Sequence, residues 1–422
     1  MVLAVFVATV LIANICGTPI PSCLIGAALG TIIYEAITGF KSPRFISSCG
    51  ATVSAVVGAL ALGGSNNYIA VAIGGVIIAV VYILFALLIK FGGRKLFDRI
   101  FPPIVVGPVT RVIGLNLAGF IPGYLGFTDP TTGAVLTGKA FEIAVQTQMI
   151  PRLVALFTLL ITAFVSHYGK GFLKTLSFLV GLISGFILAV VLEFSHAYDF
   201  DIASHYTNIK WFNPDDFAFM RWKDSPFSWD QLPGILLLFI PVSICAALEH
   251  YSDHKTLSNI LGTDLTVNPG LDRTLIGDGV ASAVGAAVGG LPNTSYGESI
   301  ATIGFSKIGS VWITLVAALI VGVLGFLAPV TAFISSIPSA VFAGCAFILY
   351  GYIAESGLKT LFNSHVDLAD NRNLIIISVI LTSGVSGVAL FDASFKGTSL
   401  AMVLGVLLNL ILKPSSKNKV SQ

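Results

Sequence analysis

The sequence predicts an all-α polytopic membrane protein with fourteen transmembrane segments arranged as a 7+7 inverted repeat. Of its 422 residues, 55% are hydrophobic and only 10% are charged. The apolar residues come in blocks of about 15 to 25, which is long enough for a helix to cross a hydrocarbon core roughly 30 Å thick. Two apolar segments far apart in the chain are also interrupted in the same way, which is typical of secondary transporters.

The apolar blocks define the spans in chain order. The N-terminal stretch lacks the basic region and small-residue cleavage site of a signal peptide, so we interpret it as the first span. The predicted spans are 1–15, 18–38, 46–62, 67–89, 101–121, 148–166, 173–194, 233–254, 274–290, 294–306, 309–330, 337–353, 373–390 and 398–412. With the N-terminus inside, sixteen Lys and Arg residues, including Arg44, fall in inside loops and six fall outside. This excess predicts a protein of the cytoplasmic membrane with both termini in the cytoplasm.

Spans 3 and 10 are too rich in Pro, Gly, Ser and Thr for continuous helices. Residues 41–58 (KSPRFISSCGATVSAVVG) and 289–304 (GGLPNTSYGESIATIG) each begin with a Pro near the membrane edge. Each is followed by a Pro-led helix, in which Pro102 matches Pro338 and Val105 matches Val341. A seven-span unit therefore occurs twice, and the odd number of spans inverts the second copy. Paired breaks of this kind predict a transport site between the interrupted segments.

A polar cluster, CAALEHYSDHKT (245–256), ends the apolar run of span 8. On a helix Glu249 and Asp253 share one face with Cys245, and His250 and His254 lie about 100° further round. Two carboxylates in a low dielectric repel each other, so we expect at least one to hold a proton near neutral pH. The cluster is thus a candidate proton-coupling site. The alternative is that it is merely the polar end of the span at the membrane surface.

Arg111, the five cysteines and the net charge bear on the kind of site that the chain can form. Arg111 falls near the middle of span 5, where an unpaired charge is costly, so we expect a carboxylate or backbone carbonyl partner for it. The five cysteines have no CxxC spacing, and neither a disulfide framework nor a metal site is indicated. Neither the net charge of +2 nor its distribution indicates a nucleic-acid partner.

Five stretches in order, LEHYSDH, NPGLDRTLIGDG, LPNTSYGES, IPSAVFAG and NLIIISVILTSGVSG, resemble the nucleobase–cation symporter-2 family, the uracil and xanthine permeases. The resemblance covers about residues 1–412. It implies a core domain of spans 1–4 and 8–11 that moves against a gate domain of spans 5–7 and 12–14, with short strands in spans 3 and 10. The corresponding residue ranges are 1–92 and 233–336 for the core, 93–232 and 337–413 for the gate, and 414–422 for a cytoplasmic tail.

The resemblance also implies site residues. The substrate-binding positions would be Glu249 in span 8, Tyr296, Gly297 and Glu298 in span 10, and Tyr350 in the gate domain. In span 3, around residues 47–51, this chain has SSCGA where uracil permeases carry phenylalanines. The interrupted backbone around Cys49 and Gly50, and at Gly297, is expected to offer N–H donors. Asp253 stands where the uracil type has His and the purine type has Asp. Asp278 resembles the xanthine-type carboxylate of span 9. Proton coupling is expected from Glu249, His250, Asp253 and Asp278.

These observations predict a proton-coupled nucleobase importer, with uracil favoured and xanthine or another purine base as the alternative. Its expected partners are the nucleobase, protons and the lipid bilayer; a homodimer stays open, and no cofactor or metal is expected. An anion exchanger or channel on the same fold is the alternative from another class, although carboxylates at the site disfavour an anion. A facilitator without proton coupling is a further alternative. An intramembrane aspartyl protease is disfavoured because Leu275 replaces the first Gly of the GxGD motif and no Tyr-Asp partner occurs, so we predict no enzyme.

Overall fold

The computed structural model describes residues 1–48, 50–64, 66–92, 100–129, 134–206, 217, 222–223, 225–295, 297–389 and 397–412. The chain begins with α1 (Val2–Cys16), α2 (Ile20–Ile37), β1 (Ile46–Ser48), the short helix η1 (Gly50–Thr52), α3 (Val53–Ala61), α4 (Tyr68–Leu87) and the turn η2 (Leu88–Gly92). It continues through α6 (Pro103–Ala118), α7 (Ile121–Tyr124), α8 (Gly138–Thr147), α9 (Met149–Tyr168), α10 (Phe172–Thr175), α11 (Ser177–Phe194), η3 (Ile202–Tyr206) and η6 (Trp229–Gln231).

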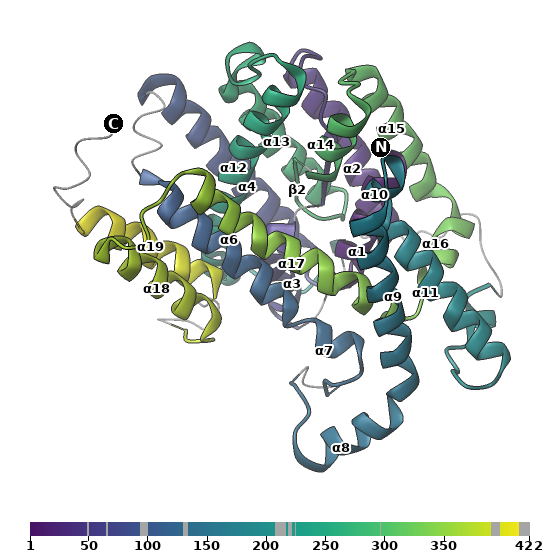
Figure 1. The fold of residues 1–422 in the computed structure, drawn as a ribbon. Coiled ribbons are helices and arrows are strands. Elements are labelled where there is room, and N and C mark those ends of the chain that lie inside the picture. Colours follow the sequence, from purple (N-terminus) through teal and green to yellow (C-terminus); the bar gives the residue numbers. More distant parts are fainter. Residues whose placement is uncertain are drawn as a thin grey trace.

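The remaining elements are α12 (Leu232–Leu261), η7 (Thr266–Gly270), α13 (Leu271–Ala287), β2 (Asn293–Ser295), α14 (Gly297–Ser306), α15 (Val311–Phe326), α16 (Ala328–Ser335), α17 (Ser339–Asn363), α18 (Asn371–Val385) and α19 (Thr398–Ile411). Figure 1 shows these elements side by side in a largely helical molecule. Each of the fourteen predicted ranges contains a helix. The bounds differ most at α12 and α17, which extend beyond the predicted ends, and at the predicted span 309–330. There the chain bends by 77° between α15 and α16, because Pro329 restricts the backbone before it and starts a new helix.

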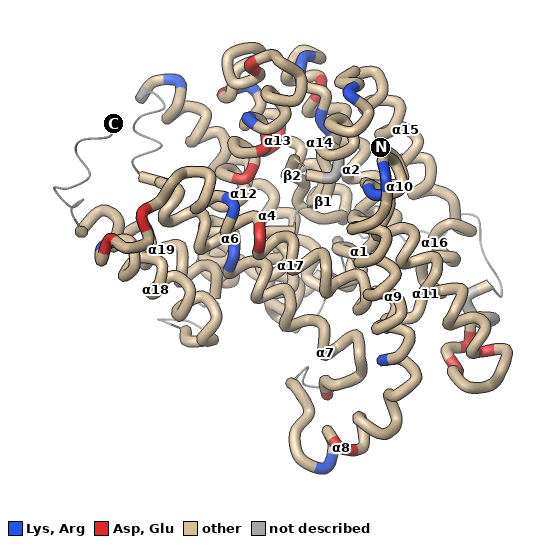
Figure 2. The backbone as a smooth tube through the Cα atoms, in the orientation of Figure 1, with Lys and Arg blue, Asp and Glu red and all other residues tan. Residues whose placement is uncertain are grey.

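The helices have the composition of membrane spans. In the described part of the chain, seven helices are long and apolar enough to cross a membrane, and the bent pair α15 and α16 makes eight. The outer helices expose large apolar side chains, for example Leu160 and Phe164 on α9 and Val191 on α11, as expected for helices that face lipid. Figure 2 shows Lys, Arg, Asp and Glu mainly near helix ends and in connections. The chain is therefore a multi-pass membrane protein.

The helix packing falls into two groups. In the first group α13 packs on α4 and α2, α2 packs on α15, and α12 packs on α4. In the second group α17 packs on α6 and α9, α9 packs on α11, and α18 packs on α6 and α19. Small residues allow the closest crossing, since an added Cβ at Gly114 of α6 would come within 2.4 Å of the Ala354 nitrogen of α17.

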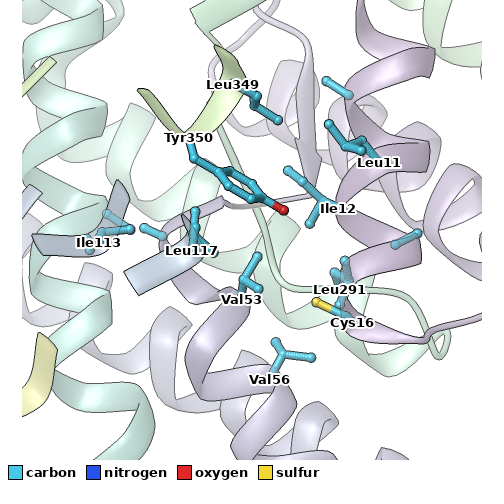
Figure 3. Close-up of a cluster of buried hydrophobic side chains, with 14 of the residues drawn as sticks. Leu11, Ile12, Cys16, Val53, Val56, Ile113, Leu117, Leu291, Leu349 and Tyr350 are labelled. Carbon is cyan, nitrogen blue, oxygen red and sulfur yellow. The ribbon is translucent and has the colours of Figure 1, made fainter. Parts of the chain in front are cut away.

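A buried apolar cluster lies where the two groups meet. Figure 3 shows Tyr350 of α17 and Leu117 of α6 facing Ile12 of α1 and Val53 of α3. Tyr350 is 2% exposed, so its ring is enclosed by this packing. α1 packs on α2 and α3 packs on α4, so both belong to the first helix group. The second helix group thus contacts the first through close apolar packing.

Candidate functional site

The two interrupted segments meet as a pair of short strands. β1 and β2 are antiparallel, with Ile46 opposite Ser295, Ser47 opposite Thr294 and Ser48 opposite Asn293. Polar side chains from neighbouring elements satisfy the buried backbone beside them. Thr31 Oγ1 of α2 donates to the Ile46 carbonyl at 2.9 Å and accepts from the Ile46 amide at 3.0 Å. Non-helical backbone can lie deep inside the molecule here because its polar groups have partners.

A helix starts directly after each strand, and the two starts differ in their surroundings. An added Cβ at Gly50, the first residue of η1, would lie 3.4 Å from Ile353 Cδ1 of α17. An added Cβ at Gly297, the first residue of α14, would have no atom of the described residues within 4 Å. The second helix group therefore reaches η1 closely, whereas open space remains beside the start of α14.

The predicted polar cluster of span 8 lies within α12 rather than at its end. Glu249 is half-buried, whereas His250 and His254 are completely buried. The helix continues to Leu261, so these side chains lie well inside it. The interpretation of the cluster as a polar helix end at the surface is therefore wrong for the two histidines.

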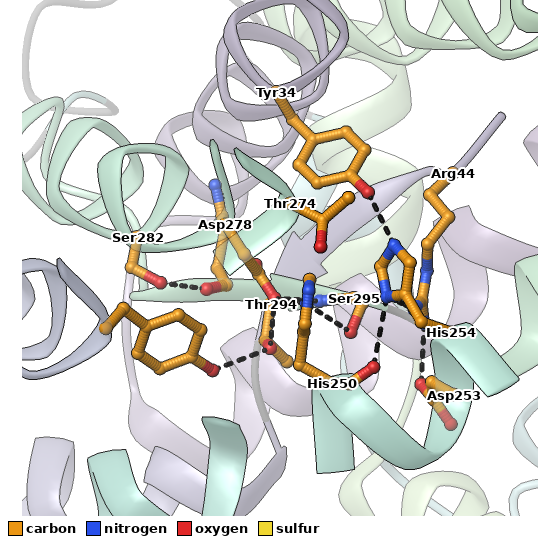
Figure 4. Close-up of polar contacts among 12 residues, drawn as sticks. Tyr34, Arg44, His250, Asp253, His254, Thr274, Asp278, Ser282, Thr294 and Ser295 are labelled. Carbon is orange, nitrogen blue, oxygen red and sulfur yellow. Dashed lines mark hydrogen bonds and ion pairs between the residues drawn. The ribbon is translucent and has the colours of Figure 1, made fainter. Parts of the chain in front are cut away.

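His250 and Asp278 form a buried pair. His250 Nδ1 lies 2.5 Å from Asp278 Oδ2, and neither side chain is exposed. Asp278 Oδ2 also accepts from Thr294 Oγ1 at 3.1 Å and from the Ser295 amide at 3.2 Å, so the pair is joined to β2 (Figure 4). Asp278 Oδ1 and His250 Nε2 have no partner in the described part of the chain. Two titratable groups thus share one hydrogen bond in a buried site and leave one polar atom each uncommitted.

Arg44 forms a second buried polar group with Asp253 and His254. Its Nη2 donates to Asp253 Oδ2 at 2.6 Å, and its Nη1 lies 2.8 Å from His254 Nδ1. Arg44 is completely buried, and the Asp253 side chain is 21% exposed. Two like charges about 4 Å apart repel by roughly 4 kcal/mol at an effective dielectric constant of about 20. Arg44 thus favours an ionised Asp253 and a neutral His254.

α2 supplies the remaining members of this group. Tyr34 Oη lies 2.9 Å from His254 Nε2 and 2.8 Å from Ser42 Oγ. Glu35 Oε1 accepts from the Arg44 backbone amide at 3.2 Å, and its other oxygen has no partner among the described residues. Tyr34 and Glu35 were not among the predicted site residues, and Arg44 was expected in an inside loop as a charge that sets the topology. The adjacent Tyr and Glu within an apolar run were the available signal for a buried polar site.

Several predicted residues remain untested by this geometry. Cys49 and Tyr296 lie outside the described residues, as does the side chain of Glu298. Arg111 is half-buried in α6 beside Gly357 of α17. The expected carboxylate or carbonyl partner of its side chain is not found among the described residues.

A cavity of about 420 Å³ lies between α6, α7 and α17. Its lining includes Leu115, Phe127, Phe347 and Tyr350 and is mostly apolar. The polar groups around the strands do not line it. It therefore lies apart from the polar groups of β1, β2, α12 and α13, although Tyr350, a predicted substrate-binding residue, lines it.

Two solved structures share this fold. The transmembrane domain of a cyanobacterium bicarbonate transporter, BicA, matches with a TM-score of 0.65 at 18% identity, covering 97% of this chain and 94% of that one. The murine anion transporter Slc26a9 in its inward-facing state matches with a TM-score of 0.66 at 12% identity, covering 97% of this chain and 66% of that one. At these identities the likeness shows the fold alone.

Sequence comparison identifies relatives along nearly the whole chain. The uracil permease of Bacillus caldolyticus is 35% identical over 97% of this chain and 89% of its own length. The uracil permease of Bacillus subtilis (strain 168) is 34% identical over 99% and 91%, and that of Escherichia coli (strain K12) is 32% identical over 97% and 89%. A family model described as Permease family (Xan_ur_permease) matches residues 1–393. The resemblance drawn from the five motifs is confirmed, and the chain belongs to this permease family, a family of transporters rather than enzymes.

Proposed function

We propose that this permease imports a nucleobase together with protons by alternating access, and that uracil is the favoured base. One observation carries the proposal: β1 and β2 pair beside α12, and the start of α14 at Gly297 borders open space. Relatives at 32–35% identity are uracil permeases. A broken span beside a carboxylate-bearing helix supplies both backbone donors and side-chain acceptors, which a flat base with alternating N–H and C=O groups requires.

Glu249 and Glu298 are the proposed acceptors for the N–H groups of the base. Glu249 belongs to α12 and Glu298 belongs to α14. The backbone around Cys49, Gly50, Tyr296 and Gly297 is the proposed source of N–H donors, and Tyr350 is the proposed gate-side neighbour. A bound base that lacks a matched N–H would leave one of these carboxylates without its proposed partner, which costs about 1 to 3 kcal/mol.

The proposed 7+7 inverted repeat is supported by the symmetry of the packing. In this repeat, α2, α4, α6, α9 and α11 of the first copy correspond to α13, α15, α17, α18 and α19 of the second. Exchanging the two copies then turns the α4–α13 contact into the α15–α2 contact. The same exchange turns α6–α18 into α17–α9, and α9–α11 into α18–α19. All of these contacts occur. α6 and α17, the proposed equivalents of each other, each have a proline at the N-cap, Pro102 and Pro338.

We propose that the two packing groups belong to the core and gate domains. The first group contains α2, α4, α12, α13 and α15, and the second contains α6, α9, α11, α17, α18 and α19. The apolar cluster between them in Figure 3 includes Cys16 at the end of α1. With the N-terminus in the cytoplasm, as we propose, this cluster would close the passage on the outer side. Alternating access would then separate these apolar side chains.

The His250–Asp278 pair is the proposed coupling site. With a neutral His and an ionised Asp the buried pair carries one negative charge, and one added proton makes it neutral overall. Burial disfavours the charged form of the pair, so a change in the burial of the site would change its affinity for that proton. The hydrogen bonds from Thr294 and Ser295 join the pair to β2, the strand beside the proposed substrate position. Glu249 and Asp253 remain candidates for the same role.

Uptake into proteoliposomes tests the proposal. Radiolabelled uracil should accumulate when the outside is more acidic, and unlabelled uracil should compete better than xanthine, hypoxanthine or uric acid. Uptake that is unaffected by the pH gradient would make the protein a facilitator. Preferential competition by xanthine would instead select the purine alternative, which Asp253 and Asp278 favour by resemblance. Bicarbonate or chloride exchange without nucleobase uptake would select the anion-exchanger alternative.

A further inference from the structure

A line of buried polar side chains leads from the His250–Asp278 pair toward the surface at Lys41. The His250 and His254 rings lie 4.2 Å apart between centroids. His254 Nε2 lies 2.9 Å from Tyr34 Oη, which lies 2.8 Å from Ser42 Oγ. Ser42 is completely buried, but it follows directly on the exposed Lys41. Groups of this kind can exchange protons, so the line is a potential leak beside the proposed coupling site.

Arg44 contacts His254, and this contact determines which nitrogen of the His254 ring carries a proton. His254 Nδ1 lies 2.8 Å from Arg44 Nη1 and 3.0 Å from the His250 carbonyl oxygen. A guanidinium can only donate, whereas a carbonyl can only accept. With the ring proton on Nδ1, His254 would donate to the His250 carbonyl, and the Arg44 N–H would be left without an acceptor at the ring. The contact with Arg44 therefore favours the other neutral tautomer, in which Nδ1 accepts and the single ring proton resides on Nε2.

The rest of the hydrogen-bond line agrees with this tautomer. The Nε2–H donates to Tyr34 Oη, and the Tyr34 hydroxyl then donates to Ser42 Oγ. The titratable and charged groups that contact the His254 ring or its direct partners come from four segments: His250 and Asp253 of α12, Tyr34 and Glu35 of α2, Arg44 before β1, and Asp278 of α13. Of these only Arg44 places a fixed positive charge against the ring.

We propose that Arg44 is a proton barrier: it holds His254 in one neutral tautomer and so prevents protons from passing between the surface at Lys41 and the His250–Asp278 pair. This inference rests on the proposed proton coupling of that pair. Arg44 contacts neither the proposed base position nor the pair itself, so it acts as a positioning residue through His254. Without such a barrier the proton gradient would dissipate without transport.

Proton entry into proteoliposomes without nucleobase tests the barrier. Vesicles with an internal pH dye are given an inside-negative potassium diffusion potential, and the rate of internal acidification is recorded. Arg44→Gln should raise this rate at least about threefold over the parent, because His254 can then accept a second proton. Arg44→Gln/His254→Asn should return the rate to that of the parent. Arg44→Lys, which keeps a positive charge beside His254, should leak no more than the parent.

Folding and coupling are followed separately in the same preparations. Each variant is used only if it elutes as a single species and binds uracil. If Arg44→Gln alone does not fold, the charge-balanced Arg44→Gln/Asp253→Asn carries the same expectation. A parent-like rate in the folded Arg44→Gln variant, or a leak that persists without His254, would overturn the barrier. Absence of uracil-dependent proton uptake by the parent would instead overturn the coupling proposal, because the leak assay uses no nucleobase.

Discussion

His250 Nδ1 and Asp278 Oδ2 are 2.5 Å apart although their residues belong to different helices, and both side chains are completely buried. Burial of an unpaired carboxylate would be costly, and here the imidazole and two donors of β2 surround one oxygen. The second oxygen is left without a partner in the described part of the chain. The uncommitted oxygen offers a position for an added proton, on which the proposed coupling role rests.

The first prediction assigns coupling to Asp278. Asp278→Asn keeps the size of the side chain and removes the titratable carboxylate, so accumulation of uracil against its gradient should be lost while exchange of labelled for unlabelled uracil persists. Both are measured in the same proteoliposomes. Thr294→Val is the matched control, because it removes one donor to Asp278 but retains the carboxylate. Loss of uracil binding in Asp278→Asn would assign the residue to the substrate instead.

The second prediction concerns the Arg44–Asp253 ion pair. Asp253→Asn leaves the completely buried guanidinium without its charged partner. Removal of one partner of a buried pair is strongly destabilising, and the partial exposure of Asp253 lowers the effect to roughly 2 to 4 kcal/mol. The apparent melting temperature in detergent should fall, and adding Arg44→Gln to remove both charges should restore part of it. A melting temperature equal to that of the parent would show that the ion pair adds no stability. The proposed coupling role would then be the main reason for a carboxylate at position 253.

The third prediction tests the acceptors of the base. Glu249→Gln and Glu298→Gln keep the shape of the side chain but replace one acceptor oxygen with a donor, so each should weaken uracil binding at least about tenfold. N-methylated uracils should compete poorly for the parent. Isothermal titration in detergent measures both effects. If Glu298→Gln binds uracil like the parent but loses xanthine, the base assignment is wrong and xanthine is the substrate.

The sequence was sufficient to locate the helices, because an apolar run of span length in a membrane has few alternatives to a helix. It could also locate the interruptions, since Pro43 and Pro292 precede the residues that form β1 and β2. It could not place Arg44. A basic residue beside a proline at a membrane edge fits an inside loop, and its ion-pair partner Asp253 lies 209 positions further along the chain. Such a contact depends on the tertiary packing of α2, α12 and β1, for which a single sequence carries no direct signal.

The fourth prediction concerns orientation. Single cysteines at positions 95, 174 and 417, in place of lysines, should be protected from an impermeant thiol reagent applied to intact cells, whereas a cysteine in place of Asp224 should react. Four native cysteines are buried within the described residues. All native cysteines are nevertheless removed first, so that none of them reacts with the reagent. Permeabilised cells provide the control for intrinsic reactivity. Labelling at position 95 from outside would reverse the proposed orientation of both termini.

The last prediction separates the substrate position from the packing around it by means of two glycines. An added Cβ at Gly297 would enter open space, whereas one at Gly30 of α2 would come within 2.6 Å of Asn293 Nδ2. Asn293 Nδ2 donates to the Gly26 carbonyl at 2.8 Å, so a Cβ at Gly30 must displace a buried side chain that anchors β2. Gly30→Ala should therefore lower the melting temperature of the protein in detergent. Gly297→Ala should leave that temperature unchanged yet weaken uracil binding at least about threefold, because the methyl group occupies the space proposed for the base. Both are measured on the same purified preparations, by thermal unfolding and by calorimetric titration. Normal uracil affinity in a stable Gly297→Ala variant would show that the base lies elsewhere than beside the start of α14.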